Sequence, residues 1–176
     1  LVNWNFMNDK NQIKFDKAIV ILNDGRISDF CNSLIELYDD LTCSCFFRRQ
    51  DHSIYAEQLE IVARVEDDPN DFDLNLVKGF VYLLNDMAKQ SFNYLSRAID
   101  LDMFIDLSWS LRASLDSEIN PNCKVDALCA VLLNPTARNY FVLAGLSESQ
   151  DDIQEDNKSL IYYSNAIKLR PDFACA

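Results

Sequence analysis

The side chains best suited to chemistry are six cysteines and a single histidine. A structural zinc site usually contains ligand pairs at short spacing, such as two cysteines separated by two residues. Cys43 and Cys45 form the one close pair, and their single intervening residue gives poor geometry for a shared metal ion. We therefore expect no metal site and no cofactor. The other cysteines stand further apart: Cys31, Cys123, Cys129 and Cys175.

His52 is the only histidine, and it follows Asp51 at an expected helix start. A cysteine nucleophile needs a base within reach, and His52 is the one histidine that could serve. The chain contains no G-x-G-x-x-G, P-loop, H-E-x-x-H or G-x-S-x-G motif. We therefore expect a protein that is not an enzyme. An enzyme whose carboxylates meet only in the fold stays a distant third hypothesis.

The net charge of the chain limits the classes of partner that we expect. The formal net charge is −12, with acidic runs at 66–68, 71–73 and 151–156. Such a surface repels phosphate backbones and anionic lipid, so we expect neither nucleic acid nor a membrane as partner. A basic protein surface is mildly favoured, although acidic runs also serve solubility.

The compartment is inferred from cysteine usage and from the absence of targeting patterns. No apolar run approaches the roughly 18 residues that span a membrane, and the N-terminus lacks the charged start and apolar core of a signal peptide. The cysteines do not occur in the spaced pairs typical of a disulfide framework, which suits a reducing compartment. We expect a cytoplasmic protein, with disulfide pairing left open.

Composition predicts an all-α fold. Apolar residues make up 49% of the chain, while 3 glycines and 4 prolines are too few for the turns of an all-β protein. Apolar residues recur at helical spacing throughout. Ser28 or Asp29 is expected to cap the second helix, and Asp51 the third. The expected helices span 12–24, 26–47, 51–65, 71–85, 93–103, 104–115, 126–135, 137–149 and 161–171.

The second half of the chain repeats itself. Three alanines, Ala98, Ala130 and Ala166, occupy matching places at steps of 32 and 36 residues. Each lies shortly before a helix end, at Met103, Pro135 and Pro171 respectively. Gly79, Ala113 and Gly145 occupy the matching small positions of the preceding helices. Small residues at these places predict closely packed antiparallel helices, with Gly79 and Gly145 facing Ala98 and Ala166.

This pattern resembles the tetratricopeptide repeat (TPR), a helix–turn–helix unit of 34 residues. The resemblance covers residues 69–176 and includes Tyr82, Trp109 and Phe141 at the family's aromatic positions; Asn75 departs from it. It implies antiparallel hairpins stacked in a right-handed α-solenoid. We expect two parts: residues 1–66, an irregular helical part packed on the array as a degenerate repeat, and residues 67–176, a TPR-like array continuing beyond residue 176.

The resemblance also implies a function: a scaffold that binds a peptide segment or a partner helix in its concave groove. Packing against the preceding hairpin is an equal alternative for Leu76, Phe80 and Leu83. Leu76, Phe80, Trp109 and Leu143 replace the polar residues of the carboxylate clamp, so no binding of acidic C-terminal tails is expected. The groove positions that the resemblance implies are Asp73, Leu76, Phe80, Leu83, Leu107, Ser110, Ser114, Ser117, Asn139, Val142, Leu146 and Ser149.

A second hypothesis is a structural module that oligomerises. Each unit of a solenoid buries its face on a neighbour, so the face of the last helix needs a cover. Ile161, Tyr163 and Ile167 stand on that face, and Phe173 follows it. Self-association through the C-terminal end of the array is the expected consequence.

Overall fold

A computed structural model describes residues 17–37, 56–148 and 153–171 of the chain. Every regular element within these ranges is a helix, which confirms the all-α class. A short helical segment at 17–23 comes first. The helices that follow are α2 (Ile27–Leu37), α4 (Ala56–Arg64), α5 (Phe72–Leu84), α6 (Ala88–Leu101), α7 (Asp106–Ala113), α8 (Cys123–Leu133), α9 (Ala137–Ser147) and α10 (Ile153–Leu169).

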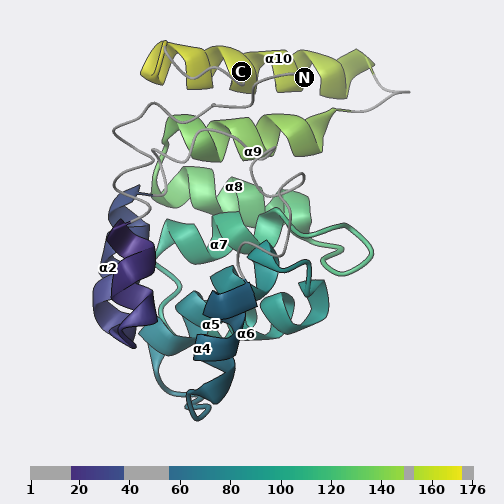
Figure 1. The fold of residues 1–176 in the computed structure, drawn as a ribbon. Helices are drawn as coiled ribbons and strands as arrows, with labels where there is room; N and C mark the ends of the chain where they lie inside the picture. Colours follow the sequence, from purple (N-terminus) through teal and green to yellow (C-terminus); the bar gives the residue numbers. More distant parts are fainter. Residues whose placement is uncertain (1–16, 38–55, 149–152, 172–176) are drawn as a thin grey trace, which may run out of the picture.

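The helices from α5 onward pack as consecutive antiparallel pairs. The most extensive contacts join α5 to α6, α7 to α8, and α9 to α10, and the pairs meet through α6–α7 and α8–α9. Figure 1 shows the resulting stack, from α5 and α6 at the bottom to α10 at the top. Both α2 and α4 contact α5, which places them at the start of the stack.

Local interactions explain the helix ends. Asp71 caps α5 by accepting the N–H of Leu74 at 3.0 Å, and Thr136 caps α9 by accepting that of Asn139 at 3.2 Å. Side-chain oxygens satisfy N–H groups that no helical carbonyl reaches. The tight turn after α5 places Asp86 in the left-handed region at φ 59°, which a short polar side chain tolerates.

The three matching alanines have equivalent surroundings. Ala98, Ala130 and Ala166 are each fully buried. Each carbonyl accepts a hydrogen bond from the N–H four residues later, at the end of its helix, and all three bonds measure 2.9 Å. The repeat found in the sequence therefore corresponds to equivalent positions on α6, α8 and α10.

The glycines differ from the prediction. A Cβ on Gly79 would lie 2.7 Å from the side chain of Leu95, one turn before Ala98. Gly145 has Tyr163 as its nearest neighbour, with the hydroxyl 3.8 Å from such a Cβ. The expected facing of these glycines with Ala98 and Ala166 is wrong, because α6 and α10 present larger side chains to them.

Two helix starts also differ. We expected Ser28 or Asp29 to cap the second helix, but α2 begins at Ile27 and Asp29 lies in its first turn, where it accepts from Arg26. We expected a helix from Phe104, but α7 begins at Asp106. The segment before it forms a turn in which the indole of Trp109 donates to the carbonyl of Met103 at 2.9 Å. The expected cap Asp51 lies outside the described residues.

One hydrophobic core joins the N-terminal part to the array. It contains buried residues of α2 such as Phe30 and Leu34, together with Leu76 and Phe80 of α5 and Leu111 of α7. Smaller clusters continue between α7, α8 and α9 and between α9 and α10. The described part of residues 1–66 therefore shares its core with the first two helical pairs.

Candidate functional site

The predicted groove positions fall into two classes in the structure. Six are buried, namely Leu76, Phe80, Leu107, Ser110, Asn139 and Val142. Buried side chains are not available to a partner in this arrangement. The structure therefore does not support these six residues as partner contacts. Asp73, Leu83, Ser114 and Leu146 are half-buried, Ser117 is exposed, and Ser149 lies outside the described residues.

Leu76 and Phe80 illustrate why the groove is closed at the first pair. Phe30 of α2 lies against Phe80, with ring centroids 6.3 Å apart, and both side chains are fully buried. Leu22, Phe30 and Leu34 of the N-terminal part are all buried in the same core, and burying three such side chains contributes roughly 5–9 kcal/mol. A peptide that had to displace them would lose more than about a thousandfold in affinity. Packing against the preceding helices, the alternative for Leu76 and Phe80, is what the structure shows.

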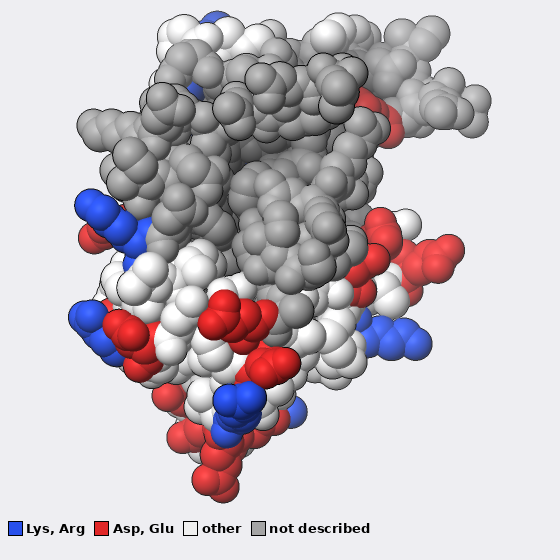
Figure 2. Space-filling view, viewed as in Figure 1, with Lys and Arg blue, Asp and Glu red and all other residues white. Residues whose placement is uncertain are grey.

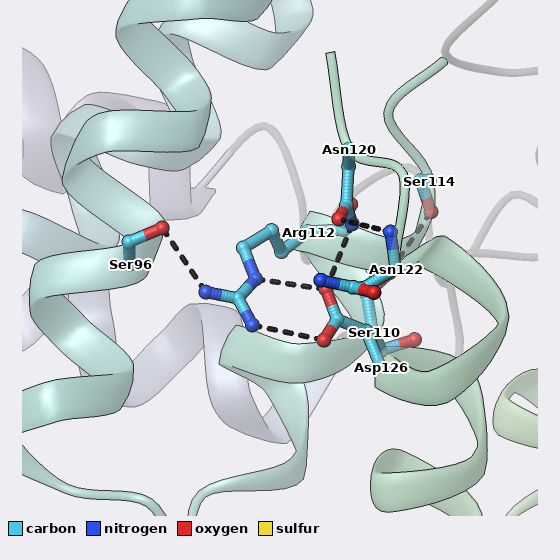
Figure 3. A network of polar contacts seen from close by, with 7 residues as sticks. All are labelled: Ser96, Ser110, Arg112, Ser114, Asn120, Asn122 and Asp126. Carbon is cyan, nitrogen blue, oxygen red and sulfur yellow. Dashed lines mark hydrogen bonds and ion pairs between the residues drawn. The ribbon is translucent and has the colours of Figure 1, made fainter. Parts of the chain in front are cut away.

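A polar network centred on Arg112 links three helices (Figure 3). The guanidinium of Arg112, on α7, donates from Nε and Nη2 to the two carboxylate oxygens of Asp126 on α8, both at 2.8 Å. Its Nη1 donates to Ser96 Oγ of α6 at 3.0 Å. Asn120, in the turn between α7 and α8, donates to the Arg112 carbonyl at 2.9 Å and to Asp126 at 2.7 Å.

The burial of this network defines its role. The side chain of Asp126 is 1% exposed and that of Arg112 is 16% exposed. The guanidinium also lies over the rings of Phe92 and Trp109, 5.6 and 5.2 Å from their centroids. Arg112 bonds both carboxylate oxygens of Asp126, and Asn120 completes the network. These hydrogen bonds hold the first two helical pairs together, so the network has a structural role.

A second network closes the connection between α4 and α5. The ammonium of Lys78, on buried α5, donates to the carbonyl of Val65 at 2.7 Å and to the carboxylate of Asp67. Tyr94 of α6 donates to the same carboxylate at 2.8 Å and stacks on Tyr82, with centroids 5.3 Å apart. Hydrogen bonds from Lys78 and Tyr94 lower the pKa of Asp67. Burial and the neighbouring Asp67 raise the pKa of Tyr94 to about 12.

Asn139 joins the second and third pairs. Its Nδ2 donates to Asp106 Oδ2 of α7 at 2.7 Å and to the carbonyl of Asn134, in the turn before α9, at 2.9 Å. The amide is fully buried. Asn139 was predicted to face the groove, but its bonds hold the start of α9 against the start of α7.

The last pair carries a tyrosine contact near the surface. Tyr163 of α10 donates to Glu148 at 2.6 Å and packs edge-on against Phe141 of α9, with centroids 5.6 Å apart. Burial and the neighbouring Glu148 raise the pKa of Tyr163. Tyr163, expected on an uncovered face, is thus half-buried between α9 and α10.

The cysteines of the described region are free thiols. Cys31 and Cys123 are buried, and Cys129 is partly exposed. Burial, with Asp73 nearby, raises the pKa of the Cys31 thiol, and burial raises that of Cys129. Raised pKa values make thiols poor nucleophiles at neutral pH. Within 17–37, 56–148 and 153–171, no cluster of three metal-ligating side chains occurs. His52, Cys43, Cys45 and Cys175 lie outside these ranges.

The charged surface is uneven. Figure 2 shows acidic side chains gathered at the lower end of the molecule, where Figure 1 places α4 and the turn that follows it. The exposed acidic residues of this region are Glu57, Glu60, Glu66, Asp67, Asp68 and Asp71. This end favours cationic over anionic partners. Among the described helices, none combines the length and apolar character needed to cross a membrane.

Comparisons with known proteins found no relative. No family model matches the chain, and neither a curated protein nor a solved structure matches it. Functional inference therefore depends on the residues and contacts described above.

Sequence reasoning missed the buried polar networks. Arg112 and Asp126 are 14 residues apart, and this spacing follows no familiar motif. A signal was present, since Arg112 adjoins the small Ala113 and Asp126 precedes Ala130 by one helical turn. Charged residues so close to core positions indicate pairing inside the fold.

Proposed function

We propose that this chain is a non-catalytic scaffold for protein–protein interaction, built as a TPR-like right-handed α-solenoid. The observation that carries the proposal is the consecutive packing of α5 to α10, in which each pair contacts the next. Equivalent burial and helix-end bonding of Ala98, Ala130 and Ala166 supports a repeating unit. Stacked helical pairs provide extended surfaces, and such surfaces are typically used to bind other proteins.

The partner surface is confined to the later part of the groove that the sequence predicted. Leu76 and Phe80 are committed to the core, which leaves the region where α7 and α9 are in contact. Ser114 and Leu146 are half-buried there, and Ser117 is exposed. An apolar contact at Leu146, together with the hydroxyl groups of Ser114 and Ser117 in the same part of the stack, suits a peptide segment or partner helix with one apolar anchor. The net charge of −12 favours basic flanking residues.

The test is affinity capture from a cell extract with the full chain, quantified by mass spectrometry. Leu146→Glu is expected to remove a specific set of captured proteins. Val125→Glu controls for an added carboxylate at an apolar position, because Val125 is exposed and lies on the other helix layer, on α8. Far-UV circular dichroism confirms that both variants remain folded. Identical capture by wild type and Leu146→Glu would refute this surface. Phe80→Ala is unsuitable, since truncating a fully buried Phe costs about 3–5 kcal/mol.

A second candidate function is end-to-end oligomerisation through α10. Leu160 and Ile161 are 64% and 58% exposed on this last described helix, and Ile167 is 43% exposed. Apolar faces of this kind mark interaction sites. Leu160→Asp should then lower the molecular mass in solution while leaving the helical content unchanged.

A further inference from the structure

Six exposed apolar side chains gather at the ends of α6, α8 and α10. Phe104 is 74% exposed and Leu132 is 82% exposed, and the other four range from 38% to 57%. We call this set the apolar edge; its members are Leu101, Met103, Phe104, Leu132, Leu133 and Leu169. Leu101, Leu133 and Leu169 each follow a matching alanine by three residues, so the edge repeats once per helical pair.

The contacts of the fold bring these three helix ends together. Asn139 bridges Asp106, just after the end of α6, and the carbonyl of Asn134, just after the end of α8. Ala137 at the start of α9 packs with Ala166 near the end of α10. In Figure 1 the antiparallel path of the chain places these junctions on one edge of the stack, and the α9–α10 connection on the other.

The opposite edge has a different chemistry. In the described turns after α5, α7 and α9, no large apolar side chain is exposed, and the exposed residues there include Asp86, Asp116, Glu118 and Glu148. Val125, in the first turn of α8, is a single exposed apolar side chain next to these turns. Exposed apolar residues are normal singly, but their concentration on one edge is a sign of an interface. The asymmetry therefore singles out the apolar edge.

The charges along the apolar edge change sign from one end to the other. Asp100 is exposed at the end of α6, and Lys168 is exposed at the end of α10. The end of α8, between them in the stack, carries Leu132 and Leu133 and the uncharged Asn134. Along the stack, the edge is therefore acidic at the end of α6, apolar at the end of α8 and basic at the end of α10.

We propose that the apolar edge binds the same edge of a second copy of this chain, antiparallel about a two-fold axis at Leu132. In a two-fold interface residue i of one copy meets residue j of the other, and j meets i. This arrangement buries Leu132 against its own counterpart. It also places Asp100 of each copy opposite Lys168 of the other. A parallel arrangement would place like charges together and is disfavoured.

This proposal does not rest on the partner surface at Leu146, which lies on α9 away from the edge. It also differs from end-to-end stacking, which uses the outward face of α10. A closed two-fold dimer stops at two copies, whereas head-to-tail stacking produces open filaments. Stoichiometry therefore separates the two kinds of self-association.

Sedimentation velocity of the full chain, from about 1 to about 200 μM, tests the proposal. We expect a monomer–dimer equilibrium for the wild type. Leu132→Asp should weaken dimerisation about a hundredfold or more, because it places a charge at the centre of the interface. Leu160→Asp is the control, because Leu160 is a leucine outside the edge that is 64% exposed, and this substitution should leave the dimer unchanged.

Charge reversal tests the antiparallel register. Asp100→Lys and Lys168→Asp should each weaken the dimer about tenfold, because each places two like-charge pairs in the interface. The double variant restores opposite charges and should recover most of the wild-type affinity. All four substitutions are at exposed positions, and far-UV circular dichroism checks that each variant folds.

Three results would overturn the proposal. The first is a wild type that remains monomeric at every concentration. The second is a dimer sensitive to Leu160→Asp and insensitive to Leu132→Asp, which would assign self-association to the α10 face. The third is a double charge variant no stronger than the single variants. A different apolar partner on the edge would give the first result.

Discussion

The bidentate pair of Arg112 and Asp126 gives the sharpest test of how the array is held together. Asp126→Ala removes a carboxylate that accepts from Arg112 Nε and Nη2 at 2.8 Å and from Asn120 at 2.7 Å. The Asp126 side chain is 1% exposed, so its removal leaves Arg112, itself 16% exposed, without a carboxylate partner at a site largely closed to water. Removing one member of a buried pair costs about 3–5 kcal/mol. We therefore expect Asp126→Ala to lower the free energy of unfolding by about 3–5 kcal/mol.

A double-mutant cycle separates the pair from general disruption. Arg112→Met keeps much of the contact with Phe92 and Trp109 while removing the charge, and it should cost a similar amount because Asp126 is left unpaired. Arg112→Met with Asp126→Leu removes both charges. The double variant should be less destabilised than the sum of the single variants by about 2–3 kcal/mol.

Urea unfolding followed by circular dichroism at 222 nm and by tryptophan fluorescence provides the measurement. Coincident transitions establish that the free energies are comparable, since repeat arrays often lose cooperativity. The exposed pair of Arg64 and Glu60 on α4 is the control, with side chains 78% and 71% exposed. Glu60→Ala should cost less than about 1 kcal/mol. An Asp126→Ala cost as small as this control would refute the assignment of the network as a buried structural pair.

Four further predictions concern packing, titration and reactivity. Gly79→Ala should lower the free energy of unfolding by about 1–3 kcal/mol, because the new methyl group would lie 2.7 Å from the neighbouring leucine; in the same urea assay, the exposed Gly145→Ala should raise it by up to about 1 kcal/mol. The pKa of Asp67 is lowered by folding, so its contribution is present above the unfolded value near pH 4 and is lost as pH falls through the folded value. Asp67→Asn should flatten acid unfolding curves below about pH 4; an unchanged acid limb would contradict this. The pKa of Tyr94 is raised to about 12, so its contribution is complete below about pH 10 and is lost between pH 10 and 12. Ultraviolet difference titration should show that Tyr94→Phe removes one late-titrating group. Cys31, buried and with a raised pKa, should resist iodoacetamide in the folded chain and react after unfolding, as peptide mapping would reveal.

The elements of the fold were largely predictable, because they depend on local patterns. Apolar spacing placed helices at 71–85 and 137–149, and the structure has α5 at Phe72–Leu84 and α9 at Ala137–Ser147. The start of α10 was missed: it begins at Ile153, eight residues before the expected position. Residues 153–160 are mostly polar, and their helicity depends on continuation into the apolar turns that pack on α9.

The sequence by itself determined the helical class and the repeat register. Helix formation follows from composition and periodicity, and the alanines at 98, 130 and 166 mark places where a larger side chain would separate neighbouring helices. Only the tertiary structure decided which surface is accessible. Phe30 is about 50 residues before Phe80, and nothing local indicates that the two rings meet. The burial of Leu76 and Phe80, the pairing of Arg112 with Asp126 and the gathering of Phe104 with Leu132 on one edge all depend on contacts between distant segments. Such contacts are set by how whole helices pack, and a sequence pattern records the faces of the helices without recording their partners.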